Sequence, residues 1–170
     1  MSFEPPVPGK ETAAEVECPC LEGGTRRFPA RAVRFRPAVY GVAVRDGRVL
    51  LGRSVFTGLL DIPGGAVEPW ELLEQGLRRE FREETGVEPE PLELVHFSES
   101  FFAIYGHPFH SLRFYFLVRV PEDATFTPQR TEITDLEWID IGAVPETQFA
   151  PGDLEILRKA LERASRWERR

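Results

Sequence analysis

Three glutamates that share one short segment are the residues of this sequence best suited to chemistry. Glu80, Glu83 and Glu84 would lie within one arc of about 100° on a helix that turns about 100° per residue. Like charges crowded in this way repel one another by roughly a few tenths of a kcal/mol per pair. A hard divalent cation would turn this repulsion into binding, because Mg²⁺ prefers carboxylate oxygens.

Arg79 precedes Glu83 by one helical turn and can fix the orientation of its carboxylate. A plainer interpretation is that the run LRREFREE at residues 77–84 is only a solvated helix face, since such charge runs are common. Taken alone, the run favours this plainer interpretation. The surrounding pattern therefore has to decide.

That pattern, residues 65–87, resembles the Nudix box of a large hydrolase family. The box reads Gly, five residues, Glu, seven residues, Arg-Glu, an apolar residue, any residue, Glu-Glu, any residue, Gly and an apolar residue. The residues that match it here are Gly65, Glu71, Arg79, Glu80, Phe81, Glu83, Glu84, Gly86 and Val87. A weaker resemblance, in the order of strands and helices, covers roughly residues 38–164.

The resemblance implies an α/β fold: an α/β/α sandwich with a mixed β-sheet, in which the box forms loop–helix–loop. It also implies roles for single residues. The glutamates matching Glu80, Glu83 and Glu84 are the catalytic acids and hold one or more Mg²⁺ ions, with Mn²⁺ as an alternative. The residue matching Gly65 often adds a backbone carbonyl ligand, and those matching Glu71 and Arg79 support the metal ligands.

The implied reaction is attack by water at a phosphorus of a nucleoside diphosphate linked to another moiety. Metal would neutralise charge, activate water and orient the leaving group. Nucleoside triphosphates, ADP-ribose, other nucleotide sugars and dinucleoside polyphosphates all stay open as small-molecule substrates. Two alternatives are a catalytically silent nucleotide-binding or sensor domain and a prenyl-diphosphate isomerase. An intact set of mutually repelling acids argues against the first, and a full match to the box argues against the second.

Family members commonly recruit a further acid from a late loop as metal ligand or general base. Glu132 is the candidate here, because it precedes Trp138 in the loop before a late strand. Asp135 and Glu137 are rivals, and an exposed loop acid without function is the plain alternative.

Aromatic residues suggest a pocket wall. The segment from Phe97 to His110 is dense in aromatic side chains, which we expect to line a pocket together although most single members are core. Trp70 stands where many family members carry Gly, and Leu60 where many carry Trp. We expect Trp70 to pack as a hydrophobic lid over the helix start rather than to stack on a base.

Composition narrows the class of protein. The chain has 170 residues, 42% of them hydrophobic, and a formal net charge of −7, so it is predicted to be globular and to bind no nucleic acid. Arg31, Arg34 and Arg36 are interpreted as a solvated strand edge. The sequence has no apolar run of membrane-spanning length and no secretory signal pattern, which predicts no membrane partner and a cytoplasmic location. A homodimer is compatible with the resemblance.

Cysteine usage indicates a reducing environment. Cys18 and Cys20 flank a proline and are interpreted as two reduced thiols. The less favoured alternative is a zinc site completed by His107 and His110.

The elements that must position these residues follow from hydrophobic periodicity. Strands are predicted at residues 39–44, 49–51, 59–62, 92–103, 112–120 and 136–141, and helices at residues 71–85 and 154–164. Asp46-Gly47 predicts a tight hairpin turn, residues 63–65 a loop, residues 105–110 another loop, and Gly86 a helix stop. Asp153 is a candidate N-cap. Residues 1–30 are predicted to be an irregular N-terminal arm, and residues 31–170 the Nudix hydrolase domain.

Overall fold

A mixed β-sheet forms the centre of the molecule. The computed structural model describes residues 14–128 and 132–167. The seven-stranded sheet has the order β5-β4-β3-β8-β7, with β6 pairing to β3 and β9 to β4. Its strands are β3 (Arg34–Arg45), β4 (Arg48–Ser54), β5 (Leu60–Asp61), β6 (Gly64–Ala66), β7 (Glu90–Ile104), β8 (His107–Arg119) and β9 (Ile133–Ile139). The pairing of β3 with β8 is parallel and the others are antiparallel.

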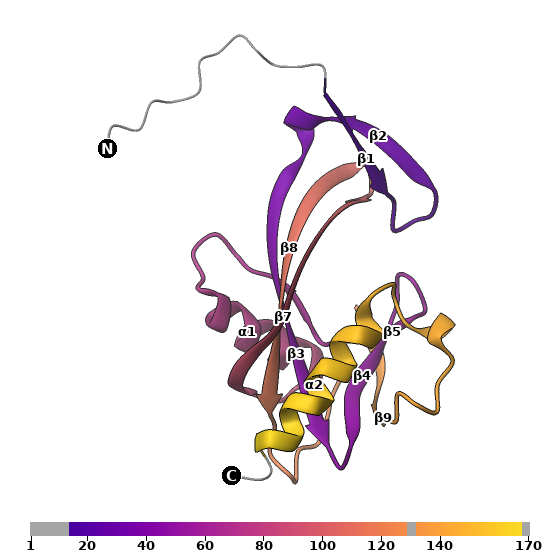
Figure 1. The fold of residues 1–170 in the computed structure, drawn as a ribbon. Coiled ribbons are helices and arrows are strands. Elements are labelled where there is room, and N and C mark those ends of the chain that lie inside the picture. Colours follow the sequence, from indigo (N-terminus) through magenta and orange to yellow (C-terminus); the bar gives the residue numbers. More distant parts are fainter. Residues whose placement is uncertain (1–13, 129–131, 168–170) are drawn as a thin grey trace.

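One helix covers each face of this sheet, as Figure 1 shows. Helix α1 (Leu73–Thr85) buries Leu77 and Phe81 in a cluster with Val39 and Ala43 of β3. Helix α2 (Asp153–Trp167) buries its apolar stripe in a second cluster, against the opposite face of the same strands. Successive side chains of a strand point to opposite faces, so alternate residues of β3 supply the two clusters. The predicted α/β/α sandwich is confirmed.

Close approach of α1 to the sheet depends on Gly41. A Cβ built at this position would lie 2.6 Å from the ring of Phe81. The ring can therefore lie flat on β3 only because the strand carries no side chain there.

Two tight turns set the register of the long strands. Asp46 and Gly47 both have positive φ, as do Tyr105 and Gly106. Such pairs are typical of the type I′ turns that match strand twist. The predicted turn after β3 is confirmed. The predicted loop over residues 105–110 is wrong, because the hairpin turn takes only two residues and β8 begins at His107.

Other boundaries also differ from the predictions. The predicted loop at residues 63–65 contains β6, which pairs with β3 through Gly65 and Val39. Helix α1 begins at Leu73 rather than Glu71 and ends, as predicted, before Gly86 with φ 77°. Strand β9 covers residues 133–139 rather than 136–141. Asp153 is the first residue of α2, and its side chain is buried.

The prediction of an irregular N-terminal arm is wrong for its described part. Strands β1 (Glu15–Pro19) and β2 (Thr25–Pro29) pair as an antiparallel hairpin. The backbone N–H of Leu21 donates to the Ala103 carbonyl at 3.0 Å, which ties the hairpin to the end of β7. Residues 1–13 of the predicted arm lie outside the described residues, and the boundary at residue 30 stays a prediction.

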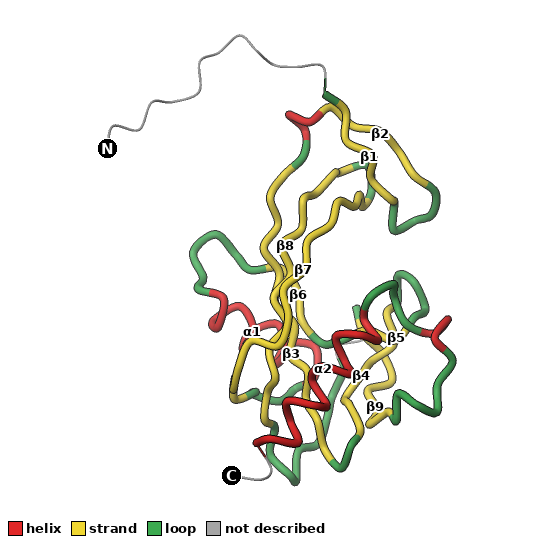
Figure 2. The backbone as a smooth tube through the Cα atoms, in the orientation of Figure 1, coloured by secondary structure: helices red, strands yellow, loops and turns green. Residues whose placement is uncertain are grey.

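The long strands extend well beyond the helices. In Figures 1 and 2, β3, β7 and β8 rise past α1 and α2, and the β1–β2 hairpin lies at their far end. The lower half of the sheet is thus covered on both faces. Within the described chain, no helix is long and apolar enough to cross a membrane.

Phe81 should be central to stability, because its ring is fully buried between α1 and β3. We expect Phe81→Ala to lower the free energy of unfolding by about 3–5 kcal/mol, since it leaves a cavity against Gly41. Phe35→Ala is the matched control, because Phe35 is 73% exposed. Urea unfolding of both variants measures the difference. Equal losses for the two would show that α1 is not anchored by this ring.

Candidate functional site

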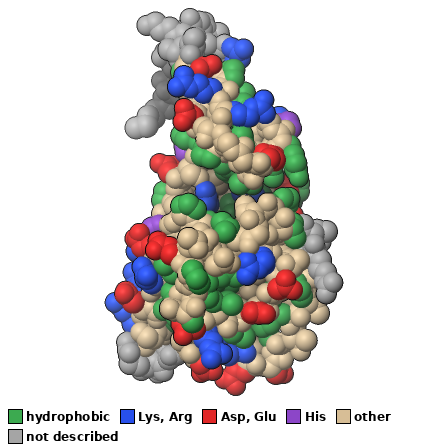
Figure 3. Space-filling model, turned by 90° about the vertical axis from the view of Figure 1, so that its right-hand side faces the viewer, with side chains coloured by type: hydrophobic (Ala, Val, Ile, Leu, Met, Phe, Trp, Pro, Cys, Tyr) green, Lys and Arg blue, Asp and Glu red, His purple; other side chains and the backbone are tan. Residues whose placement is uncertain are grey.

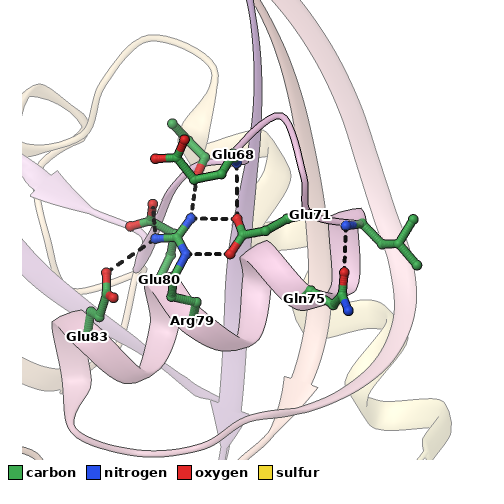
Figure 4. Close-up of polar contacts among 8 residues, drawn as sticks. Glu68, Glu71, Gln75, Arg79, Glu80 and Glu83 are labelled. Atoms are coloured by element: carbon green, nitrogen blue, oxygen red, sulfur yellow. Dashed lines mark hydrogen bonds and ion pairs between the residues drawn. The ribbon is translucent and has the colours of Figure 1, made fainter.

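Arg79 organises the acids of α1. Its guanidinium donates to Glu71 at 2.6 and 2.8 Å, to Glu80 at 2.8 Å and to Glu83 at 3.3 Å. It also donates to the backbone carbonyl of Ala66 at 2.9 Å. Figure 4 shows the guanidinium lying between these carboxylates. One cation thus joins β6, the β6–α1 loop and the helix.

The surroundings of Arg79 change how these groups hold protons. Hydrogen bonds from Arg79 and from the backbone N–H of Glu68 lower the pKa of Glu71 to about 2. The bond to Glu71 in turn raises the pKa of Arg79. Burial raises the pKa of Glu80, and the bond from Arg79 opposes this rise. Glu71 and Arg79 therefore stay an ion pair across the working pH range.

Glu84 points away from this cluster, toward the sheet. Its carboxylate accepts a hydrogen bond of 2.7 Å from the backbone N–H of Gly64. The residue is 5% exposed, and burial raises its pKa to about 8 despite that bond. Nearby Asp61 and Glu132 push in the same direction. A carboxylate in such surroundings needs a cation or a proton to compensate its charge.

The two glycines before the box helix leave room for the acids. A Cβ on Gly65 would overlap the carboxylate of Glu80, and one on Gly64 would strike the backbone of β3. Gly64 also has φ 151°, which disfavours other residues. The Gly-Gly pair therefore brings the backbone of β6 close to two helix acids, Glu80 and Glu84.

Within the described residues, no three His, Cys, Asp or Glu side chains already converge as a metal-binding group. The reason on α1 is that Arg79 holds Glu80 and Glu83, while Glu84 faces Gly64. The alternative zinc set of Cys18, Cys20 and the two histidines is likewise not assembled. Cys18 is buried and both thiols are free, as the interpretation of reduced cysteines expects.

A pocket of about 390 Å³ lies beside Glu84 on the α2 face of the sheet. It is lined by residues of β3 through β9, the end of α1, the start of α2 and the β1–β2 hairpin turn. Among them are Leu21, Arg36, Tyr40, Phe56, Asp61, Gly64, Gly65, Glu84, Phe102, Ile104, Ser111, Arg113, Tyr115, Glu132 and Asp153. Figure 3 views the molecule from this side and shows the surface hollowed near mid-height.

The three late acids differ in whether they line the pocket. Glu132 lines the pocket and lies close enough to Glu84, Asp61 and Glu80 to raise their pKa values. Its rivals Asp135 and Glu137 are exposed on β9 and do not line the pocket. Position therefore favours Glu132 of the three, while its role stays a prediction.

The predicted aromatic wall is largely wrong. Of the aromatic residues between Phe97 and His110, Phe102 lines the pocket. Phe101 and His110 pack together, at 4.5 Å between ring centroids, on the opposite face of the sheet. The cause is the strand period, which sends neighbouring residues to opposite faces. Trp70 is 80% exposed, so the lid expected over the helix start does not form.

Several pocket residues were missed by the sequence analysis. Asp61, Ser111, Arg113 and Asp153 come from three elements, β5, β8 and α2, and meet only in the fold. Burial raises the pKa of Asp61 to about 6 and that of Asp153 to about 7. The charge of Asp61 adds to the rise at Asp153. One signal was available in the sequence: Ser98 and Ser100 alternate with larger residues in one strand. Alternate residues lie on the same face of a sheet, and small side chains there leave room for a pocket.

A mixed sheet between two helices, with a Gly-Gly turn leading into an acid-rich helix, defines the class of this domain. The chain belongs to the Nudix family, because the family's NUDIX domain model matches residues 34–160.

The chain is similar to known proteins of this family. It is 40% identical over 116 residues to the NAD-capped RNA hydrolase NudC of Chromobacterium violaceum, covering 66% of this chain and 40% of that protein. It is 46% identical over 59 residues to the nucleoside triphosphatase NudI of Escherichia coli K12, covering 32% and 42%. The chain thus spans less than half the length of the curated relatives it matches.

Solved structures agree on the fold. The crystal structure of a MutT NUDIX hydrolase from Burkholderia pseudomallei matches with a TM-score of 0.61 at 25% identity, over 76% of this chain and 97% of that one. A NUDIX hydrolase from Nitrosomonas europaea matches with a TM-score of 0.62 at 25% identity, over 77% and 90%.

Asp153 should make stability depend on pH. Its pKa is raised from the ordinary 3.8 to about 7 in the folded protein, first by burial and then by Asp61. The folded state therefore binds the proton more tightly, so its contribution to stability is full below pH 3.8 and is lost as pH rises through about 7. We expect Asp153→Asn to be the more stable protein at pH 8, by roughly 1–3 kcal/mol, and about equal to the unmodified chain at pH 4. Urea unfolding at both pH values measures this, with the exposed Asp123→Asn as control. A constant difference between the two pH values would contradict the assignment.

Proposed function

We propose that the chain is a Mg²⁺-dependent hydrolase that cleaves the diphosphate linkage of a small nucleoside-diphosphate derivative. One observation carries the proposal: Glu80 and Glu84 lie against the Gly64–Gly65 backbone at the edge of the 390 Å³ pocket. An acidic, oxygen-rich edge beside a pocket suits a metal-bound diphosphate with the rest of the substrate in the pocket.

The residues that would hold the ion are Glu80, Glu83, Glu84 and the carbonyl of Gly65. Bound there, Mg²⁺ would neutralise phosphate charge and activate water; Mn²⁺ could substitute. Arg79 keeps Glu80 and Glu83 oriented, and Glu71 keeps Arg79 in place. Glu71 and Arg79 are thus positioning residues.

Glu132 is proposed as the general base, or as a further ligand. A carboxylate already bound to a cation is a poor base, because the cation lowers its proton affinity. Glu132 avoids this conflict, since it reaches the pocket from the segment before β9 rather than from α1. Its carboxylate can take the proton of the attacking water.

The relatives support the reaction class. One is an NAD-capped RNA hydrolase and another a nucleoside triphosphatase, so both names describe hydrolysis of a substrate that contains a nucleotide. We infer a small nucleotide substrate rather than a nucleic acid, because the net charge is −7 and a polyanion gains affinity from basic surface. A cytoplasmic location and a homodimer stay predictions from the sequence.

Metal dependence tests the function directly. On a panel of nucleoside triphosphates, nucleotide sugars, ADP-ribose and dinucleoside polyphosphates, we expect EDTA to abolish phosphate release or cleavage and Mg²⁺ to restore it. Glu84→Gln, which keeps shape and removes charge, should lower kcat by roughly 10²–10⁴. Glu88→Gln is the matched control, since Glu88 pairs on the surface with Arg78 and Arg82. Full turnover in excess chelator, or equal rates for both variants, would sink the proposal.

Glu132 has its own comparison. We expect Glu132→Gln to lose at least about tenfold in kcat with metal saturating, as loss of a general base usually does. Asp135→Asn and Glu137→Gln should lose little, because both acids are exposed and neither lines the pocket. A larger effect at either rival would show that the wrong acid was chosen. No effect at any of the three would move the base to the helix, with Glu80 first.

A further inference from the structure

The floor of the pocket carries an ordered set of polar side chains away from the box helix. Parallel pairing of β3 with β8 sets Arg36 beside Ser111 and Ala38 beside Arg113. Antiparallel pairing of β7 with β8 places Ser100 on the far side of Ser111. Arg36, Ser111 and Arg113 of this row line the pocket.

Ser111 stands out within this floor. The residue is 0% exposed, yet among the described residues its hydroxyl has no hydrogen-bond partner. A buried hydroxyl without a partner costs roughly 1–3 kcal/mol. It lines the pocket, so a bound molecule can supply the partner that the protein does not.

Opposite charges face each other across the same floor without touching. Arg113 donates to Ser100 and influences the pKa of both Asp61 and Asp153. None of the ion pairs between described residues joins it to either acid. Burial raises the pKa of Asp61 to about 6 and that of Asp153 to about 7. The floor therefore offers hydrogen-bond donors on one side and carboxyl groups on the other.

The walls around this floor are apolar or aromatic. Tyr40 and Tyr115 stack at 5.1 Å between centroids at one end. Phe102, Ile104 and the hairpin residue Leu21 line the other. A flat ring between such walls would bury its faces and present its edge to the floor.

The distance to the box acids suits one molecule. Gly65 of β6, Val39 of β3 and Phe114 of β8 are successive partners across the sheet. Two strand spacings separate β6 from β8, which is on the order of 10 Å. A substrate can therefore reach from the diphosphate end to the floor.

We propose that the floor formed by Ser111, Arg113 and Asp153 binds the carbonyl-bearing edge of a planar heterocycle, a lactam or carboxamide, in an uncharged part of the substrate. This inference rests on the proposed function only in naming the other end of the molecule as the diphosphate. A carbonyl oxygen has two lone pairs and accepts from Ser111 and Arg113 together, while the adjacent N–H donates to an acid. A phosphate would instead meet the charges of Asp61 and Asp153.

Free nucleosides test the floor apart from catalysis, because they need neither metal nor a diphosphate. NMR titrations in EDTA would compare inosine and uridine, which carry a lactam, with free nicotinamide, which carries a carboxamide and no charge. Adenosine, which has no ring carbonyl, and ribose are the comparisons. We expect a carbonyl-bearing nucleoside to bind at least about tenfold more tightly than adenosine, because a buried donor left unpaired is costly. The tightest of the three identifies whether the carbonyl belongs to a purine, a pyrimidine or nicotinamide.

Variants separate the floor from the fold. Ser111→Ala removes only the unpartnered hydroxyl, so stability should be kept while the Kd of the preferred nucleoside rises about fivefold or more. Asp153→Asn should also raise that Kd. Glu99→Gln is the control, because Glu99 is exposed on the opposite face, beside His110. Adenosine binding as well as the others, or an unchanged Kd in Ser111→Ala, would overturn the inference. Hydrolysis without selective nucleoside binding would support the proposed function and contradict the binding floor. Selective nucleoside binding without hydrolysis would support the binding floor and contradict the proposed function.

Discussion

The ion pair between Arg79 and Glu71 is the constraint on which the arrangement of the site depends. Arg79 and Glu71 have side chains only 24% and 12% exposed, and the same guanidinium reaches Glu80, 15% exposed. Removing the cation would leave two mostly buried carboxylates without compensation, which is strongly destabilising. Because Arg79 also donates to the Ala66 carbonyl, it fixes the position of α1 relative to β6. The acids of the helix are thereby aimed at the Gly-Gly turn.

The pocket exists because α2 is shorter than the strands that it covers. The apolar cluster between α2 and the sheet includes Tyr115 of β8 and Phe149, which precedes α2. Beyond this cluster the same face of β3 and β8 carries Arg36, Ser111 and Arg113. The β1–β2 hairpin, at the far end of the strands, adds Leu21 to the wall. The hairpin lies outside the residues matched by the family model, so this part of the pocket wall is not part of the matched NUDIX domain.

Local patterns were sufficient to predict the parts of the structure that local forces determine. The spacing of apolar residues predicted α1 and its buried face, and Gly86 predicted where the helix ends. The helical period predicted the contact between Arg79 and Glu83. Strand ends were less certain, because β7 and β8 continue through polar residues that a two-residue turn holds in register. The hairpin of residues 15–29 was missed because its strands are mostly exposed and show little hydrophobic alternation.

The pocket floor lay beyond such patterns for a different reason. Asp61 and Asp153 are far apart in sequence, and each alone resembles an ordinary surface or capping acid. Their meeting with Arg113 depends on the parallel register of β3 with β8 and on where α2 begins. Nothing in a single segment encodes that register. The box could be identified because its acids share one helix, whereas Asp61, Arg113 and Asp153 of the floor come from three elements.

Charge is distributed unevenly along the pocket, and this gives the site a direction. Glu84, Glu80 and Glu132 crowd one end, where burial raises the pKa values of the first two and their neighbours add repulsion. Such an end lowers the stability of the folded chain unless a cation or protons compensate it. At the other end, the hydrogen-bond donors Ser111 and Arg113 lie among the acids, so no added cation is required there. An anionic group with a divalent ion is thus favoured at the first end and a neutral polar group at the second. A substrate with both can bind in only one orientation, with its phosphorus at the helix acids.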